Sequence, residues 1–123
     1  PTYGRDGVLV DTIRHCLDQS RPAGEILILD QTPTHEPAAA RQLADWHAAG
    51  KIHWERLTTA SQPAAMNRAL QLATKPLILF LDDDIIPAEG FVAAHAAAQS
   101  APDVAVIVGQ IIQPWQTPGD VPI

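Results

Sequence analysis

The sequence predicts an α/β fold in which helices flank a Rossmann-like, mostly parallel sheet, and three observations support this class. Two short apolar runs, Ile26–Leu29 and Leu77–Leu81, lack polar alternation, as expected of strands that are covered on both faces. Segments with helical spacing of apolar residues lie beside these runs. Strands that alternate with helices of about ten to fifteen residues imply right-handed crossovers and an α/β sandwich.

Four helices are predicted from the spacing of apolar residues and from the turn residues around them. For the second helix we expect Thr34 as the N-terminal cap and Gly50 as the C-terminal stop. The helices are predicted to begin near Asp6 or Gly7, Pro37, Pro63 and Pro87, and to end near Ser20, Ala49, Thr74 and Gln99. Their inner faces are expected to carry Leu9, Ile13 and Leu17, then Leu43, Trp46 and His47, then Met66, Ala69, Leu70 and Ala73, and finally Phe91, Val92 and His95.

Two further strands are predicted. Ile52–Leu57 alternates apolar and polar residues, which indicates a strand nearer an edge of the sheet, and Asp103–Gly109 is another apolar run. The chain itself begins with Pro1–Arg5, which has the composition of a loop. Because folds of this class begin with a strand, we expect a hydrophobic first strand to precede Pro1 in a longer parent chain.

Composition and charge limit the classes of function. The chain has 123 residues, 46% of them hydrophobic, which is enough for one domain with its own core. Fourteen acidic residues against eight basic ones give a formal charge of −6, and no cluster of Lys or Arg occurs. This argues against a nucleic-acid surface or a patch for anionic membranes. No apolar run is near the roughly eighteen residues of a membrane span, and no signal peptide is recognised.

For the cysteine, the histidines and the tail tryptophan we expect structural or surface positions rather than roles in a functional site. Cys16 is expected in the core. A single cysteine excludes an internal disulfide framework and indicates a reducing compartment, so we expect a cytoplasmic protein, or one at the cytoplasmic face of a membrane in the parent. Trp115 is expected to fold back on the sheet rather than to stack on a sugar. Surface or half-buried positions are favoured for the five histidines, which lack the spacing of metal ligands: His15, His35, His47, His53 and His95.

Carboxylates follow both buried runs. Asp30 closes the first, and Asp82–Asp84 directly follow the second, at the strand ends where open parallel sheets bind ligands. Three adjacent carboxylates repel one another unless a cation, a basic side chain or water offsets their charge. Because Mg²⁺ and Mn²⁺ prefer carboxylate oxygen, the triplet predicts a site for Mn²⁺ or Mg²⁺. The alternatives are a solvated acidic turn for the triplet and a turn-capping role for Asp30.

Four motifs in this order resemble the nucleotide-binding half of family-2 glycosyltransferases with the GT-A fold. They are Pro-Thr-Tyr at residues 1–3, Ile-Leu-Ile-Leu-Asp at 26–30, Pro-Ala-Ala-Met-Asn at 63–67 and Leu-Phe-Leu-Asp-Asp-Asp at 79–84. The resemblance extends from Pro1 to about Gly109. It implies transfer of a sugar from a nucleoside-diphosphate sugar, with a UDP-sugar expected, to an acceptor hydroxyl, usually with inversion at the anomeric carbon.

Carried over by position, the resemblance implies roles for individual residues. Thr2 and Tyr3 would contact the base and ribose of the nucleotide, and Asp30 would accept a hydrogen bond from uracil. Asn67 matches the asparagine of the family's helix motif, although an exposed helix residue is the alternative.

The same resemblance makes the triplet a D-x-D (DXD) motif. Asp82 would face the ribose, and Asp84 would reach the metal that bridges the diphosphate. Asp83 lies between them and is counted with the nucleotide-sugar contacts.

The sequence also departs from the family pattern. Met66 replaces an arginine that commonly precedes the asparagine, so a cationic contact is missing unless Arg68 or Arg5 supplies it. Gln31 replaces a second acidic residue after the second strand. Both changes could alter which sugar donor binds and how tightly it binds.

The resemblance predicts a division of the chain. Residues 1–112 would form the nucleotide-sugar-binding GT-A subdomain, and residues 113–123 a Pro-rich connector toward an acceptor-binding half. That half would supply the general base, usually Asp or Glu, so no catalytic residue is assigned here. We expect a fragment that is inactive alone.

Two other function classes remain open at this point. Asp82–Asp84 after an apolar run also fits the start of the nucleophile motif of haloacid-dehalogenase-type phosphohydrolases, although that motif wants Thr or Val where this chain has Ile86. The second alternative is a non-catalytic module that binds a nucleotide or a metal.

Overall fold

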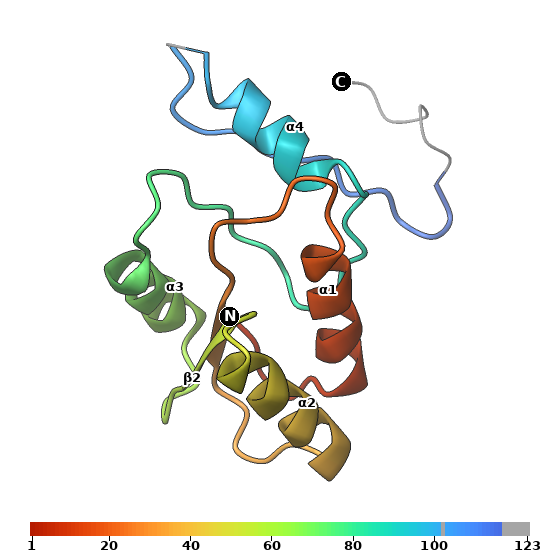
Figure 1. The fold of residues 1–123 in the computed structure, drawn as a ribbon, viewed down its shortest axis with the longest axis vertical. Coiled ribbons are helices and arrows are strands. Elements are labelled where there is room, and N and C mark those ends of the chain that lie inside the picture. Colours follow the sequence, from red (N-terminus) through yellow and green to blue (C-terminus); the bar gives the residue numbers. More distant parts are fainter. Residues whose placement is uncertain (102, 117–123) are drawn as a thin grey trace.

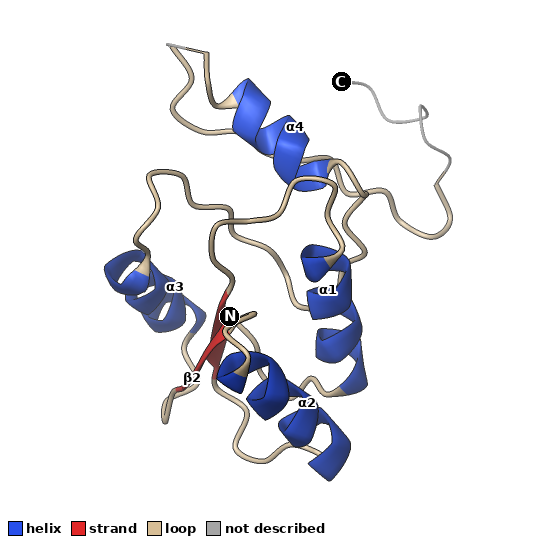
Figure 2. Cartoon of the chain, viewed as in Figure 1, coloured by secondary structure: helices blue, strands red, loops and turns tan. Residues whose placement is uncertain are grey.

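The computed structural model describes residues 1–101 and 103–116. In chain order, the elements are α1 (Gly7–Leu17), β1 (Leu27–Asp30), α2 (Pro37–Ala48), β2 (His53–Arg56), α3 (Gln62–Leu72) and α4 (Phe91–Ala98) (Figure 1). β1 and β2 pair in parallel, with Leu27 opposite His53 and Asp30 opposite Arg56. Figure 2 shows this small sheet between the helices. The predicted α/β class with parallel pairing is confirmed for these two strands.

Alternate side chains of β1 and of Ile26, which precedes it, pack into two separate cores. Ile26 and Ile28 contact the core formed with α1 and α2, whereas Leu27 and Leu29 belong to the core formed with α3. The helix pair and α3 therefore cover opposite faces of the sheet, as expected of an α/β sandwich. The first core comprises Leu9, Val10, Ile13, Ala39, Leu43, Trp46 and Ile52, and the second comprises Leu29, Ala65 and Ala69.

The ends of α2 confirm two predicted signals and correct a third. The helix begins at Pro37, where the fixed φ of proline suits the first turn. Gly50 follows the helix with a φ of 69°, the left-handed conformation that favours glycine at such an end. The N-cap position is Glu36, with extended backbone angles. The prediction of a Thr34 cap is therefore wrong.

The prediction of a buried strand at Leu77–Leu81 is also wrong. The segment forms no strand, and Leu77 and Leu79 expose 51% and 37% of their surface. A strand needs a hydrogen-bonded neighbour. Among the described residues, only Thr2 pairs with the edge of β1 that faces away from β2. The prediction that a further strand precedes Pro1 stays a prediction.

The segments after the acidic triplet differ from expectation as well. Asp103–Gly109 forms no strand, and Val108 is 88% exposed. α4 begins at Phe91 rather than at Pro87, and none of its residues is buried. Trp115 is 81% exposed, so the prediction that it packs on the sheet is wrong. Of the predicted connector at 113–123, only residues 113–116 lie within the described part of the chain.

The inner faces of α3 and α2 agree with the prediction only in part. In α3, Ala65 and Ala69 are buried whereas Leu70 is exposed, because the small residues let the helix approach β1 closely. In α2, Leu43 and Trp46 are buried as predicted, but His47 is exposed.

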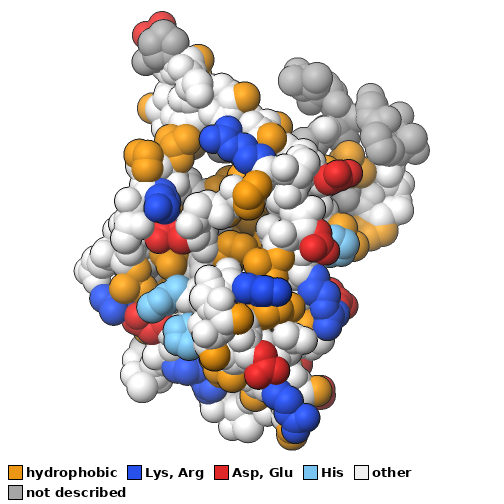
Figure 3. Space-filling view, viewed as in Figure 1, with side chains coloured by type: hydrophobic (Ala, Val, Ile, Leu, Met, Phe, Trp, Pro, Cys, Tyr) orange, Lys and Arg blue, Asp and Glu red, His pale blue; other side chains and the backbone are white. Residues whose placement is uncertain are grey.

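The surface carries charges of both signs. Figure 3 shows Lys and Arg side chains interspersed with Asp and Glu, with hydrophobic side chains visible between them on this face. No helix within the described ranges is both long enough and apolar enough to cross a membrane.

Candidate functional site

Thr2 and Asp30 meet at the carboxyl end of the sheet. The Thr2 N–H donates to the Leu29 carbonyl, and the Thr2 carbonyl accepts from the Gln31 N–H, both at 2.9 Å. The Thr2 hydroxyl is buried and has no hydrogen-bond partner among the described residues. A buried unpaired hydroxyl costs about 1–3 kcal/mol, and a hydrogen-bond partner at Thr2 would remove this cost.

The Asp30 carboxylate is fully buried and surrounded by donors. Its Oδ1 accepts from the Thr32 N–H at 2.8 Å. Its Oδ2 lies 2.7 Å from His35 Nε2 and 2.9 Å from Trp54 Nε1, and Arg56 Nε is 3.5 Å away. Burial raises the pKa of Asp30, but the hydrogen bonds from His35, Thr32 and Trp54 outweigh burial and hold the pKa below its usual value. Asp30 is therefore an anion that the fold stabilises.

His35 joins Asp30 to the start of α1. Its ring is fully buried, and Nδ1 lies 2.7 Å from Asp6 Oδ1. The same Asp6 oxygen accepts from the Glu36 N–H at 3.1 Å. Hydrogen bonds from His35 and from Glu36 lower the pKa of Asp6. The two ring nitrogens of His35 thus bridge the carboxylates of Asp6 and Asp30.

The acidic triplet lies beside the same N-terminal segment. Arg5 Nη2 donates to Asp84 Oδ2 at 2.9 Å, and Arg5 Nε lies 3.7 Å from Asp83 Oδ1. The triplet is held to α1 by the buried Thr12, whose hydroxyl lies 3.1 Å from the Asp83 carbonyl oxygen. Asp82 and Asp84 are exposed, whereas Asp83 is half-buried. Although the strand before it is absent, the triplet stands at the end of the molecule that carries Thr2.

The remaining predicted contacts lie at the surface. Tyr3 is 56% exposed, and Asn67 is exposed on α3. The structure thus groups Thr2 with Asp30, and the triplet with Arg5. Within residues 1–101 and 103–116, no hydrogen bond or ion pair joins the side chain of Tyr3 or Asn67 to either group.

Gln31, one of the two departures from the family pattern, and Arg68, near the other departure at Met66, have structural roles. The buried Gln31 donates from Nε2 to the carbonyl oxygens of Thr59 and Ser61, at 2.7 and 2.8 Å. It thereby ties the end of β1 to the start of α3. Arg68, beside Met66, donates to both carboxylate oxygens of Glu55, at 2.6 and 3.1 Å.

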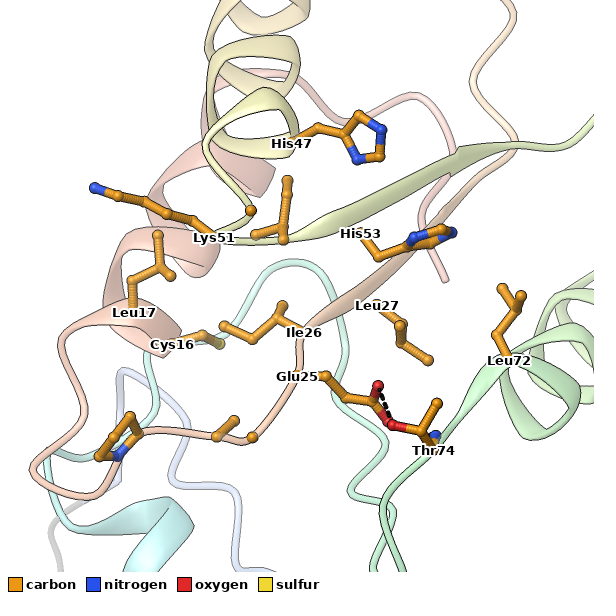
Figure 4. Close-up of a pocket in the computed structure, with 15 residues that line it drawn as sticks. Cys16, Leu17, Glu25, Ile26, Leu27, His47, Lys51, His53, Leu72 and Thr74 are labelled. Carbon is orange, nitrogen blue, oxygen red and sulfur yellow. Dashed lines mark hydrogen bonds between the residues drawn. The ribbon is translucent and has the colours of Figure 1, made fainter.

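One cavity lies beside the acidic triplet, and another lies away from these groups. The first, of about 410 Å³, lies between α1 and the acidic triplet and is lined by Asp84, Thr12 and Arg14 among others. The other, of about 520 Å³, lies at the opposite end of the sheet, where β1 and β2 begin. Figure 4 shows His47 and His53 on one side of it, and the hydrogen bond between Glu25 and Thr74 on another.

A comparison with protein families decides the classification. The family described as glycosyl transferase family 2 matches residues 1–119. The chain belongs to this family. No curated protein and no solved structure matches it significantly. Membership makes glycosyl transfer the general activity and replaces the phosphohydrolase alternative, and it implies the GT-A fold, of which the described parallel strands and helices are a compatible part.

The donor atoms of this family 2 glycosyltransferase fit a hard divalent cation at the triplet. The available ligands are carboxylate oxygens, and Asp84 is 44% exposed. The Arg5 guanidinium already places a positive charge at Asp84 Oδ2. Within residues 1–101 and 103–116, no three His, Cys, Asp or Glu side chains converge as a complete metal site. Sites for Mg²⁺ commonly use one or two protein carboxylates, and the residues of the triplet that could supply them beside Arg5 are Asp83 and Asp84.

Sequence reasoning missed His35 in this glycosyltransferase. The residue was assigned an ordinary role, yet its ring is buried between two carboxylates. Asp6 is 29 positions away and Asp30 is five, so no short spacing indicates the cluster. The one available signal is that Asp6, Asp30 and His35 each lie near a predicted end of an element, and that these ends meet at the carboxyl end of the sheet.

Proposed function

We propose that this chain forms the donor-binding part of a glycosyltransferase that transfers a sugar from a UDP-sugar to an acceptor hydroxyl, with inversion and with a divalent cation. The observation that carries the proposal is the placement of Thr2, Asp30 and Asp84 around one N-terminal segment, at the carboxyl end of the sheet. Nucleotides bind at this end in open α/β sheets. The unpaired Thr2 hydroxyl adds a group that a ligand would satisfy.

Each residue of this end would have a distinct task. Thr2 and Tyr3 would contact the base and ribose, and Asp30 would accept from the uracil ring. Because the Asp30 oxygens already accept hydrogen bonds from Thr32, His35 and Trp54, uracil would use the remaining acceptor capacity of Oδ1 after a local rearrangement. Asn67 is proposed to contact the donor only at the margin, since it lies on the exposed side of α3.

The triplet would handle the diphosphate. Asp84 would hold Mn²⁺ or Mg²⁺, with Asp82 toward the ribose and Asp83 between them. When bound, the cation would supply Lewis-acid stabilisation of the charge that builds up on the leaving diphosphate. Electrostatic stabilisation of this kind is often worth several kcal/mol of barrier. The acceptor hydroxyl needs a base within hydrogen-bond reach, and we assign none of the described residues to that step.

The test is a thermal-shift panel of UDP, GDP and ADP, each with and without Mn²⁺. We expect the largest stabilisation from UDP with Mn²⁺, because a ligand that binds only the folded state raises the unfolding midpoint. Asp84→Asn should abolish the metal-dependent part. Asp45→Asn, which changes an exposed aspartate on α2, should leave the shift intact.

Equal shifts for wild type and Asp84→Asn would contradict the metal role of Asp84. Equal shifts for all three nucleotides would contradict the uridine assignment. Nucleotide binding by an intact protein that never transfers a sugar would favour the alternative of a non-catalytic module.

A further inference from the structure

Arg5 is placed between the two halves of the proposed donor site. Thr2 pairs with β1 three positions before it, and Gly4 turns the chain with a φ of 65° while its N–H donates to Thr32 Oγ1 at 2.9 Å. This left-handed turn suits glycine. The guanidinium then contacts two consecutive carboxylates, Asp84 at 2.9 Å and Asp83 at 3.7 Å. The backbone before Arg5 is thus fixed to the sheet, while its guanidinium forms a partly exposed ion pair with the triplet.

The tip of Arg5 can move, whereas its target is anchored. The Arg5 side chain is 46% exposed, so water competes for the ion pair and the pair is weak. The backbone of the triplet is fixed because the Thr12 hydroxyl lies within 3.1 Å of the carbonyl oxygens of Asp83 and Ile85. Another cation can therefore displace the guanidinium without moving the backbone that carries the carboxylates.

Arg68, the other arginine that could supply the missing cationic contact, is already paired with Glu55. Arg68 forms two hydrogen bonds to Glu55 of β2, and these raise its pKa and lower that of Glu55. A paired fork of this kind is a strong geometry. Arg5 is thus the better candidate for the cationic contact that Met66 leaves open.

We propose that Arg5 exchanges partners. Without metal, its guanidinium occupies the Asp84 oxygen, and when a divalent cation binds Asp84, the freed guanidinium binds the diphosphate of the donor. The inference rests on the proposed function. A guanidinium fork matches phosphate oxygens in pairs, so the exchange places one positive charge at the triplet in one state and at the diphosphate in the other.

The exchange predicts effects of opposite sign in one variant. In Arg5→Gln, Mn²⁺ alone should bind about two- to five-fold more tightly, because the metal no longer displaces an exposed ion pair. UDP in the presence of saturating Mn²⁺ should bind about ten-fold more weakly, because a charge-assisted contact is lost. A purely structural role for Arg5 would weaken both.

The experiment measures Mn²⁺ binding by electron paramagnetic resonance and UDP binding by calorimetry, on wild type, Arg5→Gln and Arg5→Lys. Arg14→Gln is the matched control, because Arg14 forms an exposed 2.7 Å pair with Asp11 on α1. Arg14→Gln should change neither affinity. Arg5→Lys keeps the charge without the fork, and should retain wild-type Mn²⁺ affinity and lose part of the UDP affinity. Unfolding midpoints without ligand establish that each variant folds.

The outcomes separate the inference from the proposed function. If wild type binds Mn²⁺ and UDP, but Arg5→Gln has unchanged or weaker Mn²⁺ affinity, the exchange is overturned while the proposed function stands. Unchanged UDP affinity in Arg5→Gln overturns it as well. If neither wild type nor Arg5→Gln binds Mn²⁺, the metal role in the proposed function fails together with the exchange.

Discussion

At the scale of single residues, polar burial is concentrated around Asp30. Its carboxylate and the His35 ring are both fully shielded from water, and Trp54 and Thr32 supply the remaining donors. Burying such groups is tolerated only when they are paired and hydrogen-bonded. The pair also ties the end of β1 to α1 through Asp6. A cluster of this kind specifies one arrangement of the segments that meet there.

Replacing His35 with alanine should destabilise the fold by about 2–4 kcal/mol, because it leaves the buried Asp30 carboxylate without its closest donor. Urea unfolding at neutral pH measures the change. His53→Ala is the control, since that ring is exposed and lies 3.6 Å from Glu55, and it should change stability by less than about 0.5 kcal/mol. A loss of unfolding free energy in His35→Ala that is no larger than the loss in His53→Ala would contradict the predicted stabilisation by the cluster around Asp30.

The sequence marked Asp30 as special because it ends an apolar run, and the structure agrees on its position at the end of β1. The role of His35 was beyond the reach of sequence reasoning. A histidine becomes a bridge only when the fold brings two carboxylates to its two nitrogens, and neither neighbour is set by local propensity.

At the scale of elements, side-chain period decides the packing. Ile26, just before β1, and Ile28 lie on one face, and Leu27 and Leu29 lie on the other, which is the period of two expected for a strand. α3 meets the second face with Ala65 and Ala69, four positions apart, so they share one side of the helix. Small side chains on that side allow close contact with Leu29.

Enlarging one of these alanines should therefore be costly. Ala65→Leu should destabilise the domain by about 1–3 kcal/mol, because Ala65 is fully buried against Leu29 and the added carbons have no room. Ala64→Leu, one position away on the exposed side of α3, is the control and should be close to neutral. Thermal unfolding of both variants gives the comparison, and similar midpoints for the two would contradict the packing described.

The pairing of elements also explains why the strand predicted at Leu77–Leu81 does not form. The apolar run Leu77–Leu81 has the composition of a buried strand. Composition states what a segment can bury, whereas pairing depends on a neighbour with free backbone groups. Beside Thr2, the described residues offer no such neighbour.

At the scale of the whole molecule, stability is distributed unevenly. The sheet joins α2 and α3 directly, and α1 packs on α2. Among the described elements, α4 contacts no other helix or strand. Its N-terminal end is held by Gln19, whose Oε1 accepts from the Val92 N–H at 3.1 Å and whose Nε2 donates to the Ala88 carbonyl at 2.9 Å.

Amide hydrogen exchange should reveal the difference in local stability between α4 and the helices that pack on the sheet. We expect α4 to exchange faster than α3, because none of its residues is buried whereas α3 contributes Ala65 and Ala69 to a core. Segments with few buried contacts open with less free energy than the rest of a domain. Mass spectrometry of peptides from both helices tests this, and equal protection would show that α4 unfolds together with the sheet.

Local pattern in the sequence was sufficient for the α/β class, for all four helices to within a few residues at most ends, and for the strands at residues 27–30 and 53–56. These depend on period, proline and glycine, which act between near neighbours in the chain. Only the tertiary structure decided that Asp30 and Asp6 share His35, that Arg5 pairs with Asp84, and that the run before the triplet stays unpaired. Each of these joins or separates groups far apart in the chain, and their energies depend on distances that only folding sets.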